Sequence, residues 1–168
     1  GEGYEVPSLW GVKEDVYCAG KDSTFVFLED VLTEVTDLFP YELVHIGGDE
    51  CPKARWKECP RCQRRMRDEG LGSEEELQSY FVRRIERFLA SRNRRMVGWD
   101  EIRQGGLSET AIVLSRKREQ GLRSALENGN DVIMTPYLNC YFDYYQGSRE
   151  TEPLAFGGFL PLRTAYDL

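Results

Sequence analysis

The sequence contains no long apolar run and no excess of basic residues. No stretch approaches the roughly 20 consecutive apolar residues that a membrane-spanning helix requires, so we expect no membrane span. The formal net charge of −7 argues against a general polyanion-binding surface, and we expect no nucleic-acid partner. The first residues, Gly1 to Tyr4, include neither an initiator methionine nor a basic and apolar leader, which predicts an internal piece of a longer protein.

Histidine is limited to His45, and cysteine occurs in an odd number, five. Cys59 and Cys62 have the spacing of zinc ligands, but no second pair follows at a matching distance, and we predict no metal centre. A local disulfide or free thiols are the favoured interpretation. A bridge from Cys51 to Cys18 would brace the loop around Cys51, although spacing alone establishes no pairing.

The residues that are present suit one globular domain. The chain has 168 residues, of which 40% are apolar and 30% charged, enough for a sizeable core. A helix is expected from a cap at Asp22 or Ser23 to about Phe39, where Pro40 stops it. Its apolar residues recur at spacings of three and four and predict one buried stripe, formed by Phe27, Val31, Val35 and Leu38.

A second long helix begins with a capping box. Ser73 is predicted to accept from the amide of Glu76, and the Glu76 side chain to return the interaction. This helix should run to about Arg92 and bury one face, formed by Leu77, Phe81, Ile85, Phe88 and Leu89. A shorter helix is expected within the polar segment 52–69.

Short apolar segments alternate with these helices. Strands are predicted at 43–46, 96–99, 111–114 and 132–134, with a helix at about 119–128 before the last. No hairpin signal separates the strands, so the pattern predicts an α/β fold with a parallel sheet. A barrel and an open sheet remain alternatives at this point.

The segment from Val44 to Glu50 combines a buried strand, a Gly-Gly exit and two acids. Glycine lets the chain turn sharply and lets a ligand approach the backbone. Successive side chains of an extended chain point in opposite directions, so Asp49 and Glu50 should meet different parts of one ligand. An ordinary acidic loop after a strand is the alternative.

The motif His-Ile-Gly-Gly-Asp-Glu at 45–50 resembles the catalytic signature of glycoside hydrolase family 20, the β-N-acetylhexosaminidases. The resemblance implies that residues 1–168 are part of one (β/α)8 TIM-barrel catalytic domain, about strands four to seven, with no second domain. A full barrel needs about 250 residues, so the barrel is expected to be incomplete. The family also implies a glycan partner with a terminal N-acetylhexosamine, no cofactor, and secretion or a periplasmic location.

The resemblance further implies substrate-assisted catalysis, an exception to the usual two-carboxylate scheme. The 2-acetamido oxygen of the substrate attacks the anomeric carbon and forms an oxazolinium intermediate. By motif position, Glu50 is the general acid and then the base, and Asp49 holds the acetamido N–H.

Further matches imply an acetamido pocket. Trp99 would form its wall, Tyr141 would bond the acetamido carbonyl, and Asp143 would bind sugar hydroxyls. Core packing for Trp99 and a generic aromatic cluster for Tyr141 are the alternatives. His45 is expected to be a buried, hydrogen-bonded support, and Asp100 and Glu101 are expected to be structural.

One segment departs from the family pattern. Related bacterial sequences have Ser-Trp-Arg-Gly where this chain has Ser-Arg-Lys-Arg at 115–118, which places Arg116 at a pocket tryptophan. A guanidinium cannot replace an indole against a methyl group unless its charge has a partner. A catalytically inactive fragment or a carbohydrate-binding pseudoenzyme is therefore the alternative function. A two-carboxylate retaining glycosidase would instead require a second acid about 5–5.5 Å from Glu50.

Overall fold

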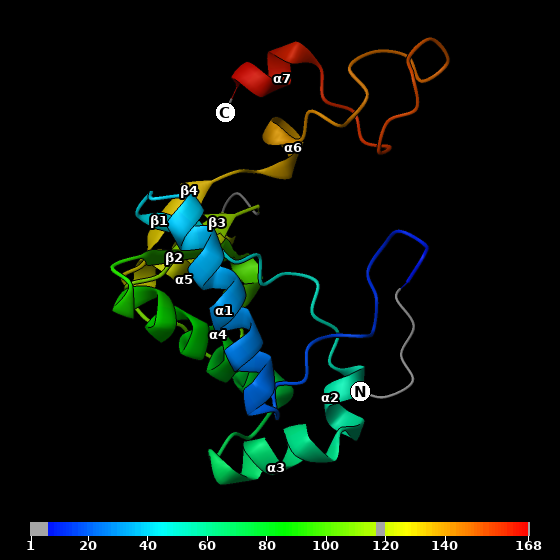
Figure 1. Ribbon diagram of the computed structural model, residues 1–168. Coiled ribbons are helices and arrows are strands. Elements are labelled where there is room, and N and C mark those ends of the chain that lie inside the picture. Colours follow the sequence, from blue (N-terminus) through cyan, green and yellow to red (C-terminus); the bar gives the residue numbers. More distant parts are fainter. Residues whose placement is uncertain (1–6, 117–119, 168) are drawn as a thin grey trace.

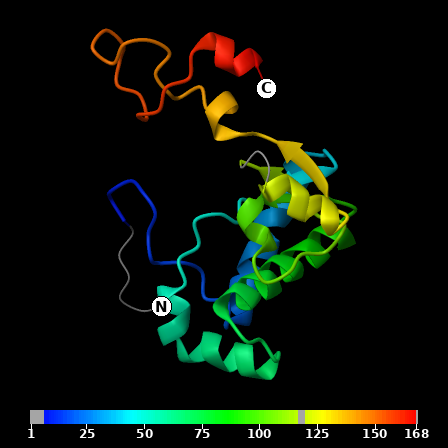
Figure 2. The ribbon, with the colours of Figure 1, turned by 180° about the vertical axis from the view of Figure 1, so that it is seen from behind.

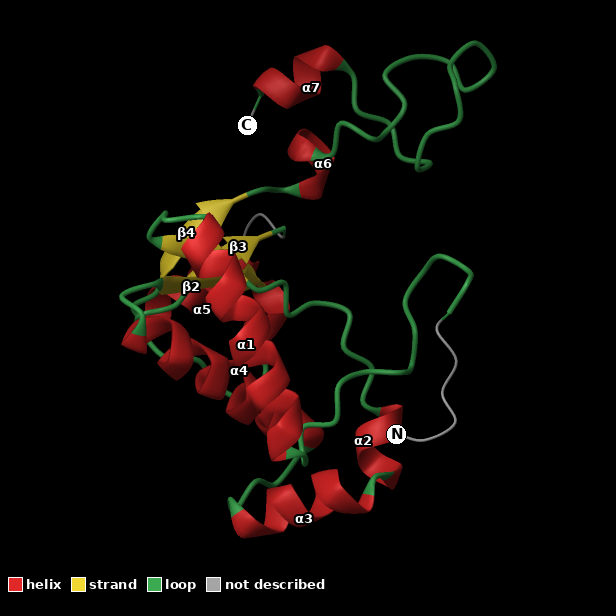
Figure 3. Ribbon diagram, viewed as in Figure 1, coloured by secondary structure: helices red, strands yellow, loops and turns green. Residues whose placement is uncertain are grey.

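The computed structural model describes residues 7–116 and 120–167. Its centre is a parallel sheet of four strands in the order β1-β2-β3-β4 (Figures 1 and 3). The strands are β1 (Leu43–His45), β2 (Arg95–Trp99), β3 (Ile112–Ser115) and β4 (Asp131–Met134). The predicted parallel α/β architecture is confirmed, and the described strands form an open sheet.

Helices precede and connect the strands. α1 (Asp22–Leu38) precedes β1, and α2 (Ala54–Glu58), α3 (Pro60–Asp68) and α4 (Glu74–Ser91) connect β1 to β2. A 3-10 helix (Asp100–Arg103) follows β2, and α5 (Gln120–Glu127) connects β3 to β4. α1 and α4 lie side by side, whereas α2 and α3 form an arm away from the sheet (Figures 1 and 2). Beyond β4 come α6 (Tyr137–Cys140), an irregular segment and α7 (Leu162–Tyr166). The sequence did not predict α6 or α7. No described helix is long and apolar enough to cross a bilayer.

The main core lies between α1, α4 and the first two strands. Phe25 is fully buried there, and its ring packs against Phe81 of α4 with a centroid distance of 4.8 Å. The other buried members of this core are Val44, Val82, Ile85, Leu89, Met96, Ile102 and Ala111. The predicted apolar face of α4 is confirmed, because its members are either buried or packed against this core and the neighbouring apolar cluster.

The predicted buried stripe of α1 is wrong. Phe27 is 52% exposed and Leu38 is 75% exposed, while Phe25 and Thr36 are buried. α1 carries apolar residues on more than one face, and contact with α4 selects the face of Phe25. The predicted cap is also wrong: Lys21 occupies the N-cap position without a side-chain cap bond, and Asp22 instead pairs with arginines of α3 and α4.

The cap of α4 forms half of the predicted box. The Ser73 hydroxyl accepts from the Glu76 amide at 3.2 Å, as predicted. The Glu76 carboxylate, however, accepts from the amide of Gly72 at 2.8 Å, one residue earlier than a capping box requires. The amide of Gly72, just before the helix, therefore takes the place of the N-cap amide as the donor to the Glu76 side chain.

Candidate active site

The chain leaves β1 through a turn that only glycine can form. Gly47 and Gly48 have φ values of +73° and +89°, where side chains with a Cβ are strained. A Cβ on Gly48 would lie 2.3 Å from Cγ2 of Ile102. The Gly47 carbonyl accepts from the Trp99 amide at 2.9 Å, so the turn is fixed to the end of β2.

Asp49 and Glu50 follow this turn and have different surroundings. Asp49 is half-buried, and its Oδ2 lies 3.5 Å from a guanidinium nitrogen of Arg116. Glu50 is exposed, has a positive φ of 48°, and lines a hollow of about 280 Å³ together with Glu101. The two adjacent acids thus face different neighbours, as two separate roles require.

Arg116 joins the ends of three strands. Its guanidinium lies over the Trp99 indole, with Cζ 4.8 Å from the ring centroid, and pairs with Glu101 at 2.6 Å. Its backbone amide donates to Oδ2 of Asp100 at 2.7 Å. Burial alone would lower the pKa of Arg116, but hydrogen bonds with Glu101 and Tyr141 outweigh burial and raise it.

The guanidinium therefore has partners for its charge, so a cation is tolerated at the predicted tryptophan position. The pocket is altered there rather than left with an unpaired charge. The two following residues of the departure, Lys117 and Arg118, lie outside the described residues.

Tyr141 stands at the end of α6 and belongs to two groups. Its side chain interacts with Arg116, which connects it to Asp49 and Trp99. Its ring also packs edge-on between Tyr137 and Tyr144, with centroid distances of 6.4 Å and 5.9 Å. The pocket interpretation and the aromatic-cluster interpretation of Tyr141 are thus compatible.

Asp143 lies in different surroundings. It is exposed and lines a separate hollow of about 910 Å³, together with Trp10, Phe142 and Phe156. Glu50 is not among the residues that line this hollow. Among the described residues, Asp143 therefore has no direct contact with Arg116, and its nearest link to the group around Arg116 is Tyr144, which packs against Tyr141.

The prediction that His45 is buried is wrong. The residue is exposed because β1 is an edge strand of the described sheet. The predicted hydrogen bond is present: Nδ1 accepts from the Gly47 amide at 3.0 Å, and the imidazole packs edge-on against Trp99. Partial desolvation lowers the pKa of His45, and the charge of Asp49 opposes that shift. A neutral His45 is the form that can accept the Gly47 hydrogen bond.

Two residues that sequence reasoning did not place in the site brace it. Gln78 of α4 is only 4% exposed, and its amide donates to the Gly48 carbonyl at 2.9 Å and accepts from Lys53. The sequence feature that could have identified Gln78 is its position as a polar residue on the buried face of the amphipathic helix α4. Glu101, expected to be structural, is the acid that holds Arg116.

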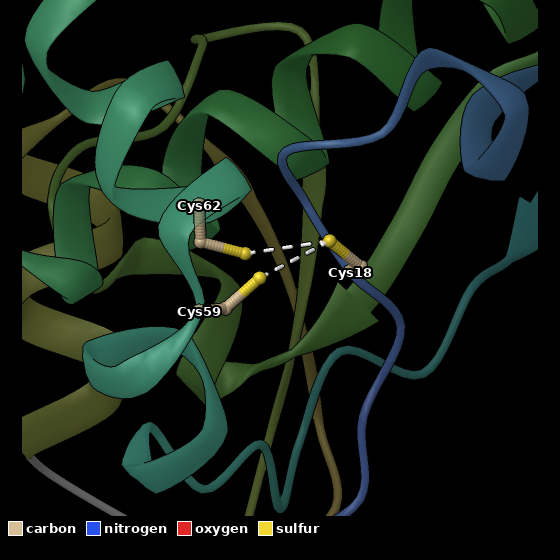
Figure 4. Close-up of side chains that lie close together, drawn as sticks. All are labelled: Cys18, Cys59 and Cys62. Atoms are coloured by element: carbon tan, nitrogen blue, oxygen red, sulfur yellow. Dashed lines mark hydrogen bonds between the residues drawn. The ribbon is translucent and has the colours of Figure 1, made fainter. Parts of the chain in front are cut away.

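The five cysteines are all free thiols. The suggested brace is absent, because Cys18 and Cys51 form no disulfide. The Cys18 sulfur instead lies 3.7 Å from that of Cys59 and 3.6 Å from that of Cys62 (Figure 4). This cluster joins the start of α3 to the loop before α1.

Parallel strands with acids and aromatic residues at their carboxyl ends define part of a (β/α)8-barrel enzyme domain. The chain belongs to glycosyl hydrolase family 20: the family profile described as its catalytic domain matches residues 2–168. This membership confirms the resemblance carried by the motif at 45–50.

Curated relatives and solved structures agree with this family membership. The β-hexosaminidase of Porphyromonas gingivalis is 54% identical over 159 residues, which are 94% of this chain and 20% of that protein. The β-hexosaminidase of Vibrio furnissii is 37% identical over 95% of this chain and 26% of its own length. The chain thus spans about a quarter or less of these relatives.

A solved structure reproduces the fold. The exo-β-N-acetylglucosaminidase of Vibrio harveyi, in complex with N-acetylglucosamine, superposes with a TM-score of 0.84 and 33% identity. The superposition covers 92% of this chain and 24% of that enzyme. The described strands therefore correspond to part of the barrel of that family.

Proposed function

We propose that the full-length protein carrying this chain is a retaining exo-β-N-acetylhexosaminidase that removes terminal GlcNAc or GalNAc from glycans. Residues 1–168 would form part of its single catalytic domain. Family membership and the names of the relatives support the hydrolase activity. The catalytic scheme rests on the placement of the acid pair.

Glu50 would protonate the departing glycosidic oxygen while the acetamido oxygen of the substrate attacks the anomeric carbon. Glu50 would then accept a proton from water as water opens the oxazolinium ring. Two inversions at the anomeric carbon give overall retention. The exposed position of Glu50 beside a hollow leaves it open to an entering glycosidic bond and to water.

Asp49 would accept the acetamido N–H and balance the positive charge that develops on the oxazolinium. A carboxylate held in place before the reaction stabilises such a charge at little reorganisation cost. Trp99 would wall the acetamido group, and Tyr141 would donate to its carbonyl. Asp143 would bind sugar hydroxyls at the outer side, in the separate hollow that it lines.

One observation carries the proposal: Arg116 contacts Asp49, Trp99 and Tyr141 at once. Three of the proposed pocket residues, which come from three different segments of the chain, therefore surround one side chain. Such convergence is expected of a binding site and not of independent core packing.

The test uses the full-length protein and an aryl N-acetylglucosaminide. Glu50→Gln should abolish hydrolysis, and Asp49→Asn should slow it by at least about 100-fold, the range for lost general acid–base or electrostatic catalysis. Glu127→Gln, an exposed acid at the end of α5, is the matched control and should be unaffected. Unchanged rates in both site variants, or equal hydrolysis of a sugar without the acetamido group, would contradict the proposal.

A second candidate is a carbohydrate-binding pseudoenzyme. The specific observation in its favour is that the Arg116 guanidinium covers the Trp99 face and contacts Asp49. An N-acetylglucosamine thiazoline, which mimics the oxazolinium, separates the candidates. Tight binding with hydrolysis supports the enzyme, tight binding without hydrolysis supports the pseudoenzyme, and absence of both leaves a scaffold.

A further inference from the structure

Three cysteine sulfurs from two distant segments meet on the α2–α3 arm. Cys59 and Cys62 lie at the start of α3, and Cys18 lies in the loop before α1 (Figure 4). All three sulfurs lie within 4.8 Å of one another. No carboxylate or imidazole joins the group among the described residues, so the donor set is thiolate alone.

The spacing of the sulfurs matches tetrahedral zinc. Zinc–thiolate bonds of about 2.3 Å place two sulfurs of a tetrahedron about 3.8 Å apart. The Cys18 sulfur lies 3.7 Å and 3.6 Å from the other two. A disulfide would require about 2.05 Å. We propose that Cys18, Cys59 and Cys62 bind a zinc ion, with a solvent molecule as the fourth ligand.

The backbone of the Cys59–Cys62 turn suits a thiolate ligand. Cys59 precedes α3, a helix of 9 residues with Pro60 in its first turn. The backbone amides of Cys62 and Arg61 donate hydrogen bonds to the Cys59 sulfur. Amides directed at a ligand sulfur hold its position and partly neutralise its charge.

The Cys18 loop is shaped to reach this turn. A Cβ on Gly20 would lie 2.2 Å from the Arg61 carbonyl carbon and 2.5 Å from the Cys62 nitrogen, so only glycine allows the two backbones to approach. The Trp56 indole donates to the Tyr17 carbonyl at 2.9 Å and fixes the other side of Cys18. The approach of Cys18 is therefore built by contacts outside the sulfurs themselves.

An apolar shell surrounds the cluster. Cys62 is fully buried among Ala19, Trp56, Met66 and Leu77, and Cys18 and Cys59 pack against the same group. A shell of this kind slows solvent access to the metal. The ion would fasten the α2–α3 arm, which follows Asp49 and Glu50 in the chain, to the loop before α1. Its role would be structural and separate from the glycosidase chemistry.

The first test measures the metal content of the full-length protein, purified with a reductant and without a chelator; the thiol state is measured on a separate sample purified without a reductant. Wild type should carry about one equivalent of zinc per chain by mass spectrometry of the metal. Cobalt(II) in its place should give the intense near-ultraviolet bands of thiolate-to-cobalt charge transfer. Cys59→Ser and Cys62→Ser should each lose the metal, while Cys140→Ser, a partly buried cysteine of α6, should retain it.

Peptide mapping of the unreduced wild type keeps the proposal testable even if the variants do not fold. Zinc-bound thiols should be recovered as free cysteines after denaturation in chelator. A disulfide from Cys18 to Cys59 or Cys62 in the native protein would overturn the proposal. Absence of stoichiometric zinc in wild type, or equal zinc in wild type and Cys62→Ser, would also overturn it.

Discussion

The Arg116 guanidinium lies over the Trp99 indole, with Cζ 4.8 Å from the ring centroid. This contact covers the face on which the proposed acetamido group would rest. The guanidinium is held there by Glu101 at 2.6 Å and by Asp49 at 3.5 Å. In the proposed site, Arg116 would therefore compete with substrate for both the aromatic wall and the carboxylate.

Replacing Arg116 should open the pocket. Arg116→Trp restores an apolar wall and releases Asp49, so we expect thiazoline affinity to rise about tenfold, equivalent to about 1.4 kcal/mol. Isothermal titration of the full-length variant measures this. Arg116→Lys, which keeps the charge but loses the planar stacking group, should not gain affinity. A loss of affinity in Arg116→Trp would show that the guanidinium itself contacts the ligand.

Gly48→Ala should destabilise the turn that carries the acids. The new Cβ meets Ile102 at 2.3 Å and the backbone keeps a positive φ, so the cost should be about 2–4 kcal/mol. Chemical denaturation measures it. Gly70→Ala is the matched control, with φ +65° and nothing within 4 Å of its Cβ, and should cost about 1 kcal/mol. Equal losses would contradict the role of the Ile102 contact.

Ser73→Ala should weaken the start of α4. The substitution removes the hydroxyl that accepts from the Glu76 amide at 3.2 Å, at a cost of about 1 kcal/mol. Thermal unfolding measures the loss. Ser73→Asp provides another acceptor and a charge that favours a helix N-terminus, so it should retain wild-type stability. Destabilisation of Ser73→Asp by the same amount would show that the cap bond is not the cause.

Asp22→Asn should reduce the pH dependence of stability. A hydrogen bond with Arg84 is the main cause that lowers the pKa of Asp22 below its ordinary 3.8; burial is the next largest effect and opposes it, and the charges of Arg65 and Arg84 add to the lowering. A lowered carboxyl pKa contributes stability above the ordinary value, and that stability is lost as the pH falls through the lowered value. The Asp22 side chain is 66% exposed, so screening limits the contribution to below about 1 kcal/mol.

The measurement compares wild type and Asp22→Asn from about pH 7 to pH 3, across the range in which carboxylates titrate. The difference in unfolding free energy should be largest at neutral pH and shrink in acid. Asp37→Asn is the control variant. It removes a different exposed ion pair, between Asp37 and Arg92 at 2.8 Å, at the other end of α1. A difference in unfolding free energy between wild type and Asp22→Asn that grows as the pH falls would contradict this prediction.

Local patterns were sufficient for the order of the four strands and the long helices, but not for the short helices α6 and α7. Alternating helices and strands predicted the parallel sheet, and the Gly-Gly exit predicted the turn that carries Asp49 and Glu50. Of the two predicted cap interactions of α4, the bond from the Glu76 amide to the Ser73 hydroxyl forms, because it lies within one turn of the helix. The Glu76 carboxylate had two amides within reach and bonds that of Gly72 instead of that of Ser73. Interactions within a few residues are encoded by adjacent side chains and backbone preferences.

The sequence by itself determined the alternation of elements, the acid pair after the first strand and the family motif. Only the tertiary structure decided that Phe25 rather than Phe27 is buried, that Cys18 meets Cys59 and Cys62, and that Arg116 lies on Trp99. Each of these depends on contact between segments far apart in the chain. Spacing along one segment carries no information about which distant surface it meets, because packing between elements selects among faces that are locally equivalent.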